Sequence, residues 1–417
     1  MIKPILFGAG CAIAGAAAGA FAFLQILPAN DVFARQDALE DGIQDWFFVG
    51  ASQVFPTRTV SRSETGTPLP ARANALDGFT FDHNGNTKTL DDMFTDMETT
   101  GLVVLKDGEI VYEKYQEGSG PGTYFTSFSL VKSFTSTLVG FAIEDGHISD
   151  VEDPLDKYLS ELAGTAYEGV TIRQALEMSS GVRFDPGGYE NMKDTLTLIV
   201  DSAILGKRSA YDIAKSFPRA SQPGTEFNYN TAESQVLLEL VRRSTGKDAA
   251  SYLEEKMWRP LGMSHDAAWI LDGPGHESAE FGGAFFNASL RDWARFGLFI
   301  EQDGYWNGER LLPENWVLQA TRTDLPHLQP GQVHPNPERG YAWHWWTLND
   351  GTFTASGANG QTLFIDQEND IVVARSSTWP RGWVKAYDEQ SIALFRALGD
   401  WDFEPDTPVS APATAFE

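Results

Sequence analysis

One segment of the chain, residues 125–146, limits the fold more than any other. It reads FTSFSLVKSFTSTLVGFAIEDG, and Lys132 is the single charged side chain between Glu117 and Glu144. A helix that is apolar on nearly every side is expected to be buried. Burial removes the water that stabilises an ammonium group and thereby lowers its pKa. The segment therefore predicts a core helix that holds one lysine away from solvent.

A serine lies one helical turn before this lysine. Side chains three and four positions apart share a face of an α-helix, so Ser129, Lys132, Ser133, Ser136 and Gly140 form one stripe of small or polar residues. A lysine that is partly neutral near pH 7 can accept a proton, and a serine within reach can supply it and become a nucleophile. The first turn of the helix also favours the negative charge that develops there. We interpret Ser129 and Lys132 as a candidate nucleophile and base.

The Ser-x-x-Lys spacing occurs twice, so context has to separate the two copies. The second copy, Ser244 to Lys247, lies at a helix end beside Arg243 and Asp248, which is typical of an exposed helix terminus. We give it a structural interpretation. The alternative for Lys132 is a side chain that reaches solvent from a partly exposed helix. Its isolation in a charge-free run disfavours that alternative.

Composition and charge narrow the possible partners. Of 417 residues, 42% are hydrophobic, and 58 acidic against 31 basic residues give a formal charge of -27. That charge repels phosphate backbones and anionic membrane surfaces, so nucleic-acid binding is not expected. The single cysteine, Cys11, excludes an intramolecular disulfide and a cysteine-rich metal site. The seven histidines show no ligand spacing, so neither a metal nor another cofactor is expected.

The N-terminus carries a charge-free run at residues 5–27, after Lys3. The run is long enough to cross a bilayer as a helix. Its small-x-small tripeptide AFA at residues 20–22 fits a signal-peptide cleavage site, whereas its length favours an uncleaved anchor. Either way we expect an exported protein, periplasmic, anchored in the inner membrane or secreted, with Lys3 on the cytoplasmic side. A buried soluble helix is the alternative.

Strand signals lie near both ends of the chain, with helical patterns between them. Residues 102–105 and 110–115 are two β-rich runs joined by a Lys-Asp-Gly-Glu turn, which predicts a hairpin. Helical patterns dominate from about residue 130 to 290, including one helix between Thr171 as cap and Gly181 as stop, and another before Gly246. Strand signals return in GTFTASG, QTLFIDQ and DIVVARSS, before a last helix in DEQSIALFRALGDW. This order indicates one sheet built from distant segments, with a helical region inserted.

The segment from Ser129 onward resembles a known family. Ser129-Leu-Val-Lys132 and the text through VTIRQALEMSSGV resemble the class C β-lactamase-related serine hydrolases, nearest the 6-aminohexanoate-dimer hydrolase group. The stretch GGAFFNASLRDWARFG, residues 282–297, resembles the same group. The resemblance implies an α/β (α+β) fold, with an antiparallel sheet flanked by helices and an inserted all-helical region. Together with the composition of the terminal segments, it predicts an anchor or signal (1–30), an extended lead-in (31–75), the hydrolase domain (76–403, helical region about 130–290) and a flexible tail (404–417).

Two further motifs of that family have counterparts here. The tyrosine motif matches PGTEFNYNTAES, which implies a proton-transfer role for Tyr229 and puts Thr231 where Asn is often found. The third motif is a strand that carries Lys or His, a small residue and Gly, and it matches TASGANGQTLFIDQ. Ala355 stands at the position of the cation, and this departure argues against penicillin as the natural substrate. Gly357 and Gln361 still match the aminohexanoate-hydrolase branch.

The resemblance implies a reaction through an acyl-enzyme on Ser129. Lys132 and Tyr229 would move the protons, and the backbone N–H groups of Ser129 and Ala358 would form the oxyanion hole. The candidates for substrate contact are Tyr189, Asn287, Gly357 and Gln361, with a helix cap as the alternative role for Asn287.

The expected partner is a small-molecule amide or ester, with contact to a membrane only through the N-terminal segment. Alternatives are a D-alanyl peptide carboxypeptidase, a β-lactamase, and a non-catalytic binding or sensor module on the same fold. The sequence carries no signal for an oligomeric state.

Overall fold

A computed structural model describes residues 52, 55–64, 66–185, 193–273, 275 and 277–403. The predicted N-terminal anchor or signal and the predicted tail from residue 404 lie outside these ranges. Within them, no helix combines the length and the apolar character needed to cross a bilayer.

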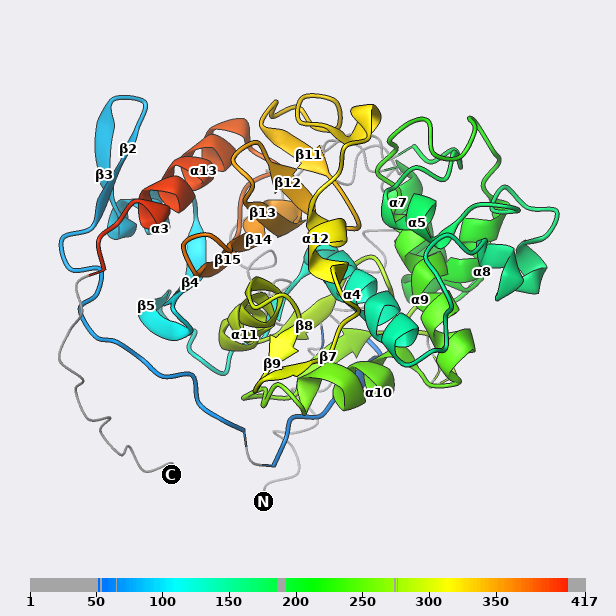
Figure 1. Cartoon of the computed structure of the whole chain (residues 1–417), viewed down its shortest axis with the longest axis horizontal. Helices are drawn as coiled ribbons and strands as arrows, with labels where there is room; N and C mark the ends of the chain where they lie inside the picture. Colours follow the sequence, from blue (N-terminus) through cyan, green and yellow to red (C-terminus); the bar gives the residue numbers. More distant parts are fainter. Residues whose placement is uncertain are drawn as a thin grey trace, which may run out of the picture.

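The main sheet joins segments that are distant in the sequence. Seven antiparallel strands lie in the order β11-β12-β13-β14-β15-β4-β5, so strands from the end of the chain extend an early hairpin (Figure 1). The strands are β4 (Thr99–Lys106), β5 (Glu109–Tyr115), β11 (Arg339–Tyr341), β12 (Trp346–Leu348), β13 (Phe353–Gly357), β14 (Gln361–Asp366) and β15 (Ile371–Ser377). The predicted hairpin, the predicted C-terminal strands and the predicted fold class are confirmed.

Helices cover both faces of this sheet because its strands are apolar on both sides. Successive side chains of a strand point to opposite faces. Leu102 and Val104 pack with helices α3 (Leu90–Asp96) and α13 (Lys385–Gly399), whereas Val103 and Leu105 belong to the larger core that contains α4 (Val131–Glu144) and α11 (Leu290–Glu301). The larger core thus encloses the helix with the buried lysine.

A second, smaller sheet was not predicted. It has the order β1-β7-β8-β6 and consists of β1 (Thr57–Val60), β6 (Phe125–Thr126), β7 (Ala267–Ile270) and β8 (Phe286–Ala288). Residues 57–60 were expected in an extended lead-in, but they pair with β7, with Thr57 opposite Ile270. The partner strand is more than half the chain away, so no local signal marks the pairing. Two short hairpins complete the strands, β2 (Thr80–His83) with β3 (Asn86–Thr89) and β9 (Tyr305–Trp306) with β10 (Glu309–Arg310).

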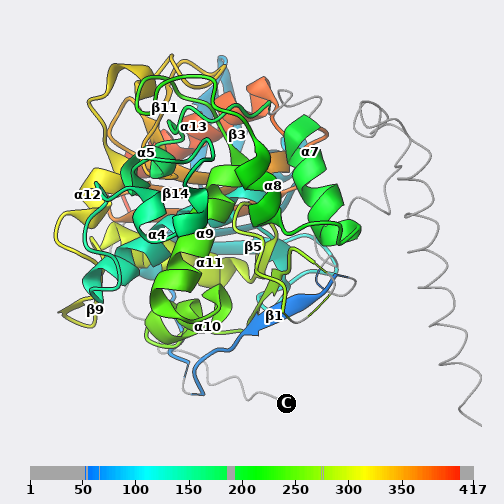
Figure 2. The ribbon, with the colours of Figure 1, turned by 90° about the vertical axis from the view of Figure 1, so that its right-hand side faces the viewer.

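The helical region forms a lobe beside the sheet, and Figure 2 views the molecule from that side. Its helices are α5 (Ile172–Leu176), α7 (Lys193–Ile199), α8 (Ala210–Ser216), α9 (Thr231–Thr245) and α10 (Ala249–Leu253), while α12 (Trp316–Thr321) follows the hairpin of β9 and β10. Thr171 caps α5 as predicted, but that helix ends at Leu176, well before Gly181. Gly246 ends α9 with a left-handed φ of 70°, which suits glycine.

Candidate active site

Ser129 lies at the junction between the small sheet and the buried helix. Strand β6 leads into a short 3-10 helix (Phe128–Leu130), and α4 continues from Val131. Phe128, directly before the serine, has a φ of 44°, which non-glycine residues rarely adopt. Strained backbone of this kind is held in place by surrounding structure and is often found at functional sites. The residue that follows this strained position is Ser129, which is half-buried.

Lys132 is buried, as the apolar helix predicted. Its side chain is 1% exposed, and Nζ donates to Ser129 Oγ at 3.0 Å and to the Gly283 carbonyl at 2.6 Å. Burial lowers the pKa of Lys132 to about 7. The snorkelling alternative is therefore wrong, and the amine is partly neutral at neutral pH. In its neutral form, Nζ can accept a hydrogen bond from the Ser129 hydroxyl instead of donating one, and can then take the serine proton.

Tyr229 completes the group from the lobe. It precedes α9, whose cap is the side chain of Asn230. Its ring centroid lies 5.1 Å from Lys132 Nζ, and its ring stacks on Trp346 at a centroid distance of 5.5 Å. Burial raises the pKa of Tyr229 to about 12, while a hydrogen bond with Ser129 acts in the opposite direction. The structure thus brings the predicted Ser129, Lys132 and Tyr229 together.

The end of β13 passes directly over the serine segment. A Cβ atom on Gly357 would lie 2.2 Å from the Ser127 carbonyl oxygen and 3.1 Å from Phe128 Cβ, so a side chain cannot be placed there. This close approach explains the glycine. Ala358, the next residue, begins a short 3-10 helix (Ala358–Gly360). The first N–H groups of a helix have no partner inside it. Ser129 and Ala358 each lie in a short 3-10 helix, and the close approach of Gly357 brings the starts of these two helices together.

The position of the third-motif cation is apolar. Ala355 is 1% exposed and belongs to the larger core. Polar groups lie on the opposite face of β13, where the Thr354 and Ser356 hydroxyls are 3.0 Å apart and Arg339 Nη1 donates to Thr354 Oγ1 at 3.0 Å. Arg339 is itself paired with Asp388, with Nη2 and Oδ1 2.5 Å apart. The positive charge of Arg339 is therefore already balanced by the Asp388 carboxylate.

The other predicted contact residues are placed differently. Asn287 is 1% exposed and lies in β8, where it accepts from Thr126 and donates to the carbonyls of Ala268 and Phe285. The alternative of a helix cap at Asn287 is wrong, because Ser289 caps α11. Gln361 is fully buried and donates to the Asn359 and Ser377 carbonyls. Both ends of the Asn287 amide are thus satisfied within the protein, whereas Gln361 Oε1 has no hydrogen-bond partner among the described residues.

Tyr189, also predicted as a substrate contact, lies outside the described residues. Gly357 lies against Ser127 and Phe128, which directly precede Ser129 in the chain. Within the part of the chain that the structure describes, no three histidine, cysteine or carboxylate side chains are grouped closely enough to hold a metal ion.

The Gly283 carbonyl is a site group that the sequence did not reveal. Backbone oxygens have no residue identity, and Gly283 is far from Lys132 in the chain. The one sequence feature that could have indicated this contact is the pair Gly282-Gly283 before AFFNASLRDWARFG. A Cβ on Gly283 would lie 2.5 Å from Thr231 Cγ2 and 3.4 Å from Lys132 Nζ. The pair is therefore a place where the backbone approaches two other segments closely.

Comparison with known proteins shows which proteins this chain is similar to. The family model described as Beta-lactamase matches residues 90–397. The 6-aminohexanoate-dimer hydrolase of Paenarthrobacter ureafaciens is 27% identical over 346 residues, which cover 80% of this chain and 85% of that protein. A solved structure from Bacillus anthracis, assigned as a 6-aminohexanoate-dimer hydrolase, superposes with a TM-score of 0.75 at 26% identity, over 86% of this chain and 94% of that one.

A family VIII carboxylesterase shares the fold, with a TM-score of 0.55 at 19% identity over 74% of this chain and 95% of the esterase. The predicted resemblance is confirmed by these matches.

Proposed function

The chain belongs to the beta-lactamase family and is a serine hydrolase, and from this premise we propose that it cleaves an amide or ester bond of a small molecule through an acyl-enzyme on Ser129. The observation that carries the proposal is the 3.0 Å contact between Lys132 Nζ and Ser129 Oγ inside the protein. The pKa of Lys132, lowered to about 7 by burial, makes it a base suited to neutral pH. The other Ser-x-x-Lys copy lacks this environment, because Lys247 is exposed and pairs with Glu255.

Acylation begins when neutral Lys132 accepts the Ser129 proton, directly or through Tyr229. Oγ then forms a bond to the carbonyl carbon, and the carbonyl π electrons move onto the oxygen. When this tetrahedral oxyanion collapses, the bond to the amine or alcohol breaks. Tyr229 protonates the leaving group and recovers a proton from the Lys132 ammonium; its high pKa of about 12 keeps it protonated until then. Water, activated by the same two groups, releases the acid and regenerates Ser129.

The backbone N–H groups of Ser129 and Ala358 stabilise the oxyanion in this scheme. Loss of one such donor typically costs about 3 kcal/mol of barrier. The support is the close contact of Gly357 with Ser127 and Phe128, which holds the two segments against each other.

The substrate class we propose is an amide or ester of a small carboxylic acid, similar to aminohexanoate oligomers. The P. ureafaciens relative is named for the 6-aminohexanoate dimer. Ala355 supports the proposal from the site itself, because no side-chain cation is available there for a β-lactam carboxylate, and Arg339 is already paired with Asp388.

A panel of four substrates tests this class. We expect turnover of aminohexanoate oligomers and short-chain nitrophenyl esters, and rates at least about 10-fold lower on nitrocefin and on D-Ala-D-Ala peptides, since a missing charge partner typically weakens transition-state binding by more than about 1.4 kcal/mol. Initial rates at equal enzyme concentration give the comparison. Preferred turnover of nitrocefin or of the D-Ala-D-Ala peptide would replace our proposal by one of those activities.

Covalent labelling tests the nucleophile. After reaction with a fluorophosphonate, mass spectrometry of the digested protein should place one adduct on the peptide that contains Ser129, because this is the serine whose hydroxyl contacts a buried amine. Labelling should increase with pH as Lys132 loses its proton near pH 7. An adduct on another peptide would contradict the assignment.

We also propose that the enzyme is exported and that its N-terminal segment is its only contact with a membrane. The charge-free run at residues 5–27 after Lys3 supports this proposal. Separation of cytoplasmic, membrane and periplasmic fractions tests it, and recovery of the full-length protein in the cytoplasm would refute it.

A further inference from the structure

The segment from Ala279 to Gly283 supplies the carbonyl that contacts the base. Gly283 O accepts from Lys132 Nζ at 2.6 Å, which is shorter than the contact with Ser129. The segment lies directly on α9, since a Cβ on Gly282 would be 2.6 Å from the Ser234 carbonyl oxygen. The position of this carbonyl therefore determines where Nζ can lie.

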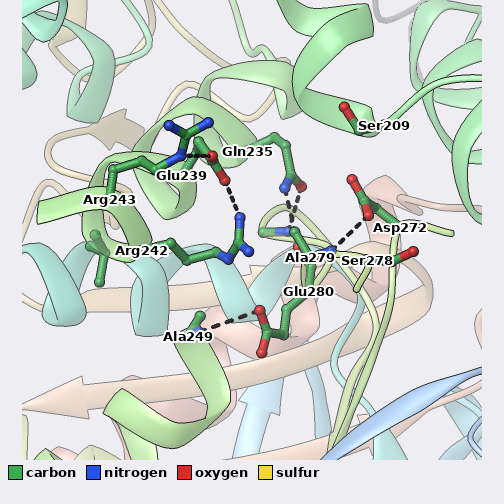
Figure 3. Close-up of polar contacts among 12 residues, drawn as sticks. Ser209, Gln235, Glu239, Arg242, Arg243, Ala249, Asp272, Ser278, Ala279 and Glu280 are labelled. Carbon is green, nitrogen blue, oxygen red and sulfur yellow. Dashed lines mark hydrogen bonds and ion pairs between the residues drawn. The ribbon is translucent and has the colours of Figure 1, made fainter. Parts of the chain in front are cut away.

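Gln235 of α9 binds this segment with both ends of its amide. Its Oε1 accepts from Gly282 N at 2.8 Å, and its Nε2 donates to Glu280 O at 3.1 Å. Figure 3 shows the side chain pointing from the helix to the segment, with a dashed line from each end of the amide. Gln235 is fully buried. Both of its contacts are thus to backbone on the N-terminal side of Gly283.

Helix α4 provides a second contact to the same residue. Thr135 Oγ1 donates to the Gly282 carbonyl at 3.0 Å, and Thr135 lies three positions after Lys132, on the same side of the helix. Gln235 and Thr135 together satisfy both backbone groups of Gly282. The base and the carbonyl that orients it are thereby connected through one short piece of backbone.

The beginning of the segment is anchored independently. Asp272 accepts from Ala279 N at 3.0 Å, and the Glu280 carboxylate accepts from Ala249 N at 3.3 Å and from Ala250 N at 3.0 Å (Figure 3). Phe281 is held as well, because its N–H donates to the Ile270 carbonyl at 2.9 Å and its carbonyl accepts from Trp269 Nε1 at 3.0 Å. The segment is thus fixed up to Phe281, and Gln235 and Thr135 hold the two backbone groups of Gly282 that follow. A change at Gln235 is therefore expected to act locally.

We propose that Gln235 is a positioning residue for the reaction, which holds the Gly283 carbonyl at Lys132 Nζ so that the amine lone pair is directed at Ser129. The inference rests on the proposed function, because it requires Lys132 to be the base. A carbonyl oxygen accepts from the ammonium form of lysine more strongly than from the amine. Displacing this oxygen should therefore both misalign the base and make its proton easier to remove.

Other groups around Lys132 do not replace this carbonyl. Tyr229 faces it from the loop before α9 and His344 from the loop between β11 and β12, and both are neutral at pH 7, with pKa values of about 12 and about 3 that result from burial. Glu233 of α9 is directed at Ser180 and Asn230 instead. Desolvation thus lowers the pKa of Lys132, and the contact with the Gly283 carbonyl opposes that effect.

The test compares two changes at Gln235 with opposite electrostatic effects. In Gln235→Met, which removes both contacts, kcat should fall about 10-fold with KM nearly unchanged, because small displacements of a catalytic group are costly. The acidic limb of the kcat/KM profile should move to lower pH by about half a unit, since the ammonium loses an acceptor. In Gln235→Glu, a carboxylate of the same shape should raise the pKa of Lys132 and move the limb to higher pH.

Rates are expressed per active site titrated with fluorophosphonate, so a smaller folded fraction alone cannot produce these shifts. Thr135→Val should repeat the effect of Gln235→Met in weaker form. Gln390→Met is the matched control, a buried amide of α13 that contacts Asp96 and should change neither kcat nor the profile. If Gln235→Met does not fold, Gln235→Glu alone tests the inference, which requires its acidic limb to move to higher pH.

Unshifted profiles with kcat within about two-fold of wild type in both variants would overturn the inference. The proposed function would fail separately, by activity that persists in Ser129→Ala.

Discussion

Replacement of Ser129 by alanine should lower kcat/KM on a short-chain ester by about 10⁴-fold or more, the range found when a nucleophile that acts together with its base is removed. The change deletes the atom that Lys132 Nζ contacts at 3.0 Å and leaves the apolar faces of α4 intact. The folded state and substrate binding should therefore be preserved. Oxyanion-hole contacts and binding alone typically retain only about 10³- to 10⁴-fold catalysis over water. Circular dichroism and ester turnover, measured on the same preparation, check both expectations.

The chain contains its own control for this experiment. Ser244→Ala alters the serine of the second Ser-x-x-Lys sequence, whose hydroxyl donates to the Val241 carbonyl at 3.2 Å near the end of α9. Because Lys247 is an exposed partner of Glu255, this variant should keep wild-type kcat/KM within about two-fold. Retention of more than about a tenth of the activity in Ser129→Ala would refute the acyl-enzyme proposal.

The part of the site that lies on one helix could be predicted from sequence because local geometry is enough to define it. Ser129 and Lys132 are one turn apart, and the apolar run around them already required burial, which the 1% exposure of Lys132 confirms. Tyr229 comes from the loop before α9 and was found only through the order of family motifs. The stacking of its ring on Trp346, which holds it beside Lys132, has no counterpart in local sequence.

Contacts made by the backbone could not be predicted in the same way. The Gly283 carbonyl and the N–H groups of Ser129 and Ala358 have no side-chain identity, and their positions depend on close approaches that glycine permits. Asn287 shows the opposite difficulty. A short polar side chain before a helix predicted a cap or a substrate contact, but pairing of β8 with β6 and β7 buries it and satisfies it within the protein.

Replacement of Lys132 by methionine should reduce kcat/KM by at least about 10³-fold and at the same time stabilise the fold. Loss of a general base typically costs about 10²- to 10⁴-fold, and here the base also activates the nucleophile. The effect on stability has the opposite sign because the pKa of Lys132 is lowered from 10.5 to about 7 by burial. Methionine has a similar length, needs no hydration and fills irregular spaces well. Activity and the free energy of unfolding should thus change in opposite directions.

The pH dependence of this stabilisation follows from the two pKa values. Below about pH 7 lysine is charged in both states, and burial of the ammonium opposes folding in full, by up to about 5 kcal/mol. Between pH 7 and 10.5 the lysine loses its proton when the chain folds. The destabilisation caused by burial therefore decreases as pH rises, and it vanishes above pH 10.5. Urea unfolding at neutral and at alkaline pH should therefore show Lys132→Met more stable than wild type, by a margin that narrows as pH rises.

The exposed Lys247 provides the control, since Lys247→Met should show no such pH-dependent margin. A wild type more stable than Lys132→Met at pH 7 would mean that the contacts of Nζ with Ser129 and Gly283 outweigh its desolvation. Lys132 would then remain protonated at neutral pH, and it could not serve as the base. The stability measurement thus tests the mechanism without any substrate.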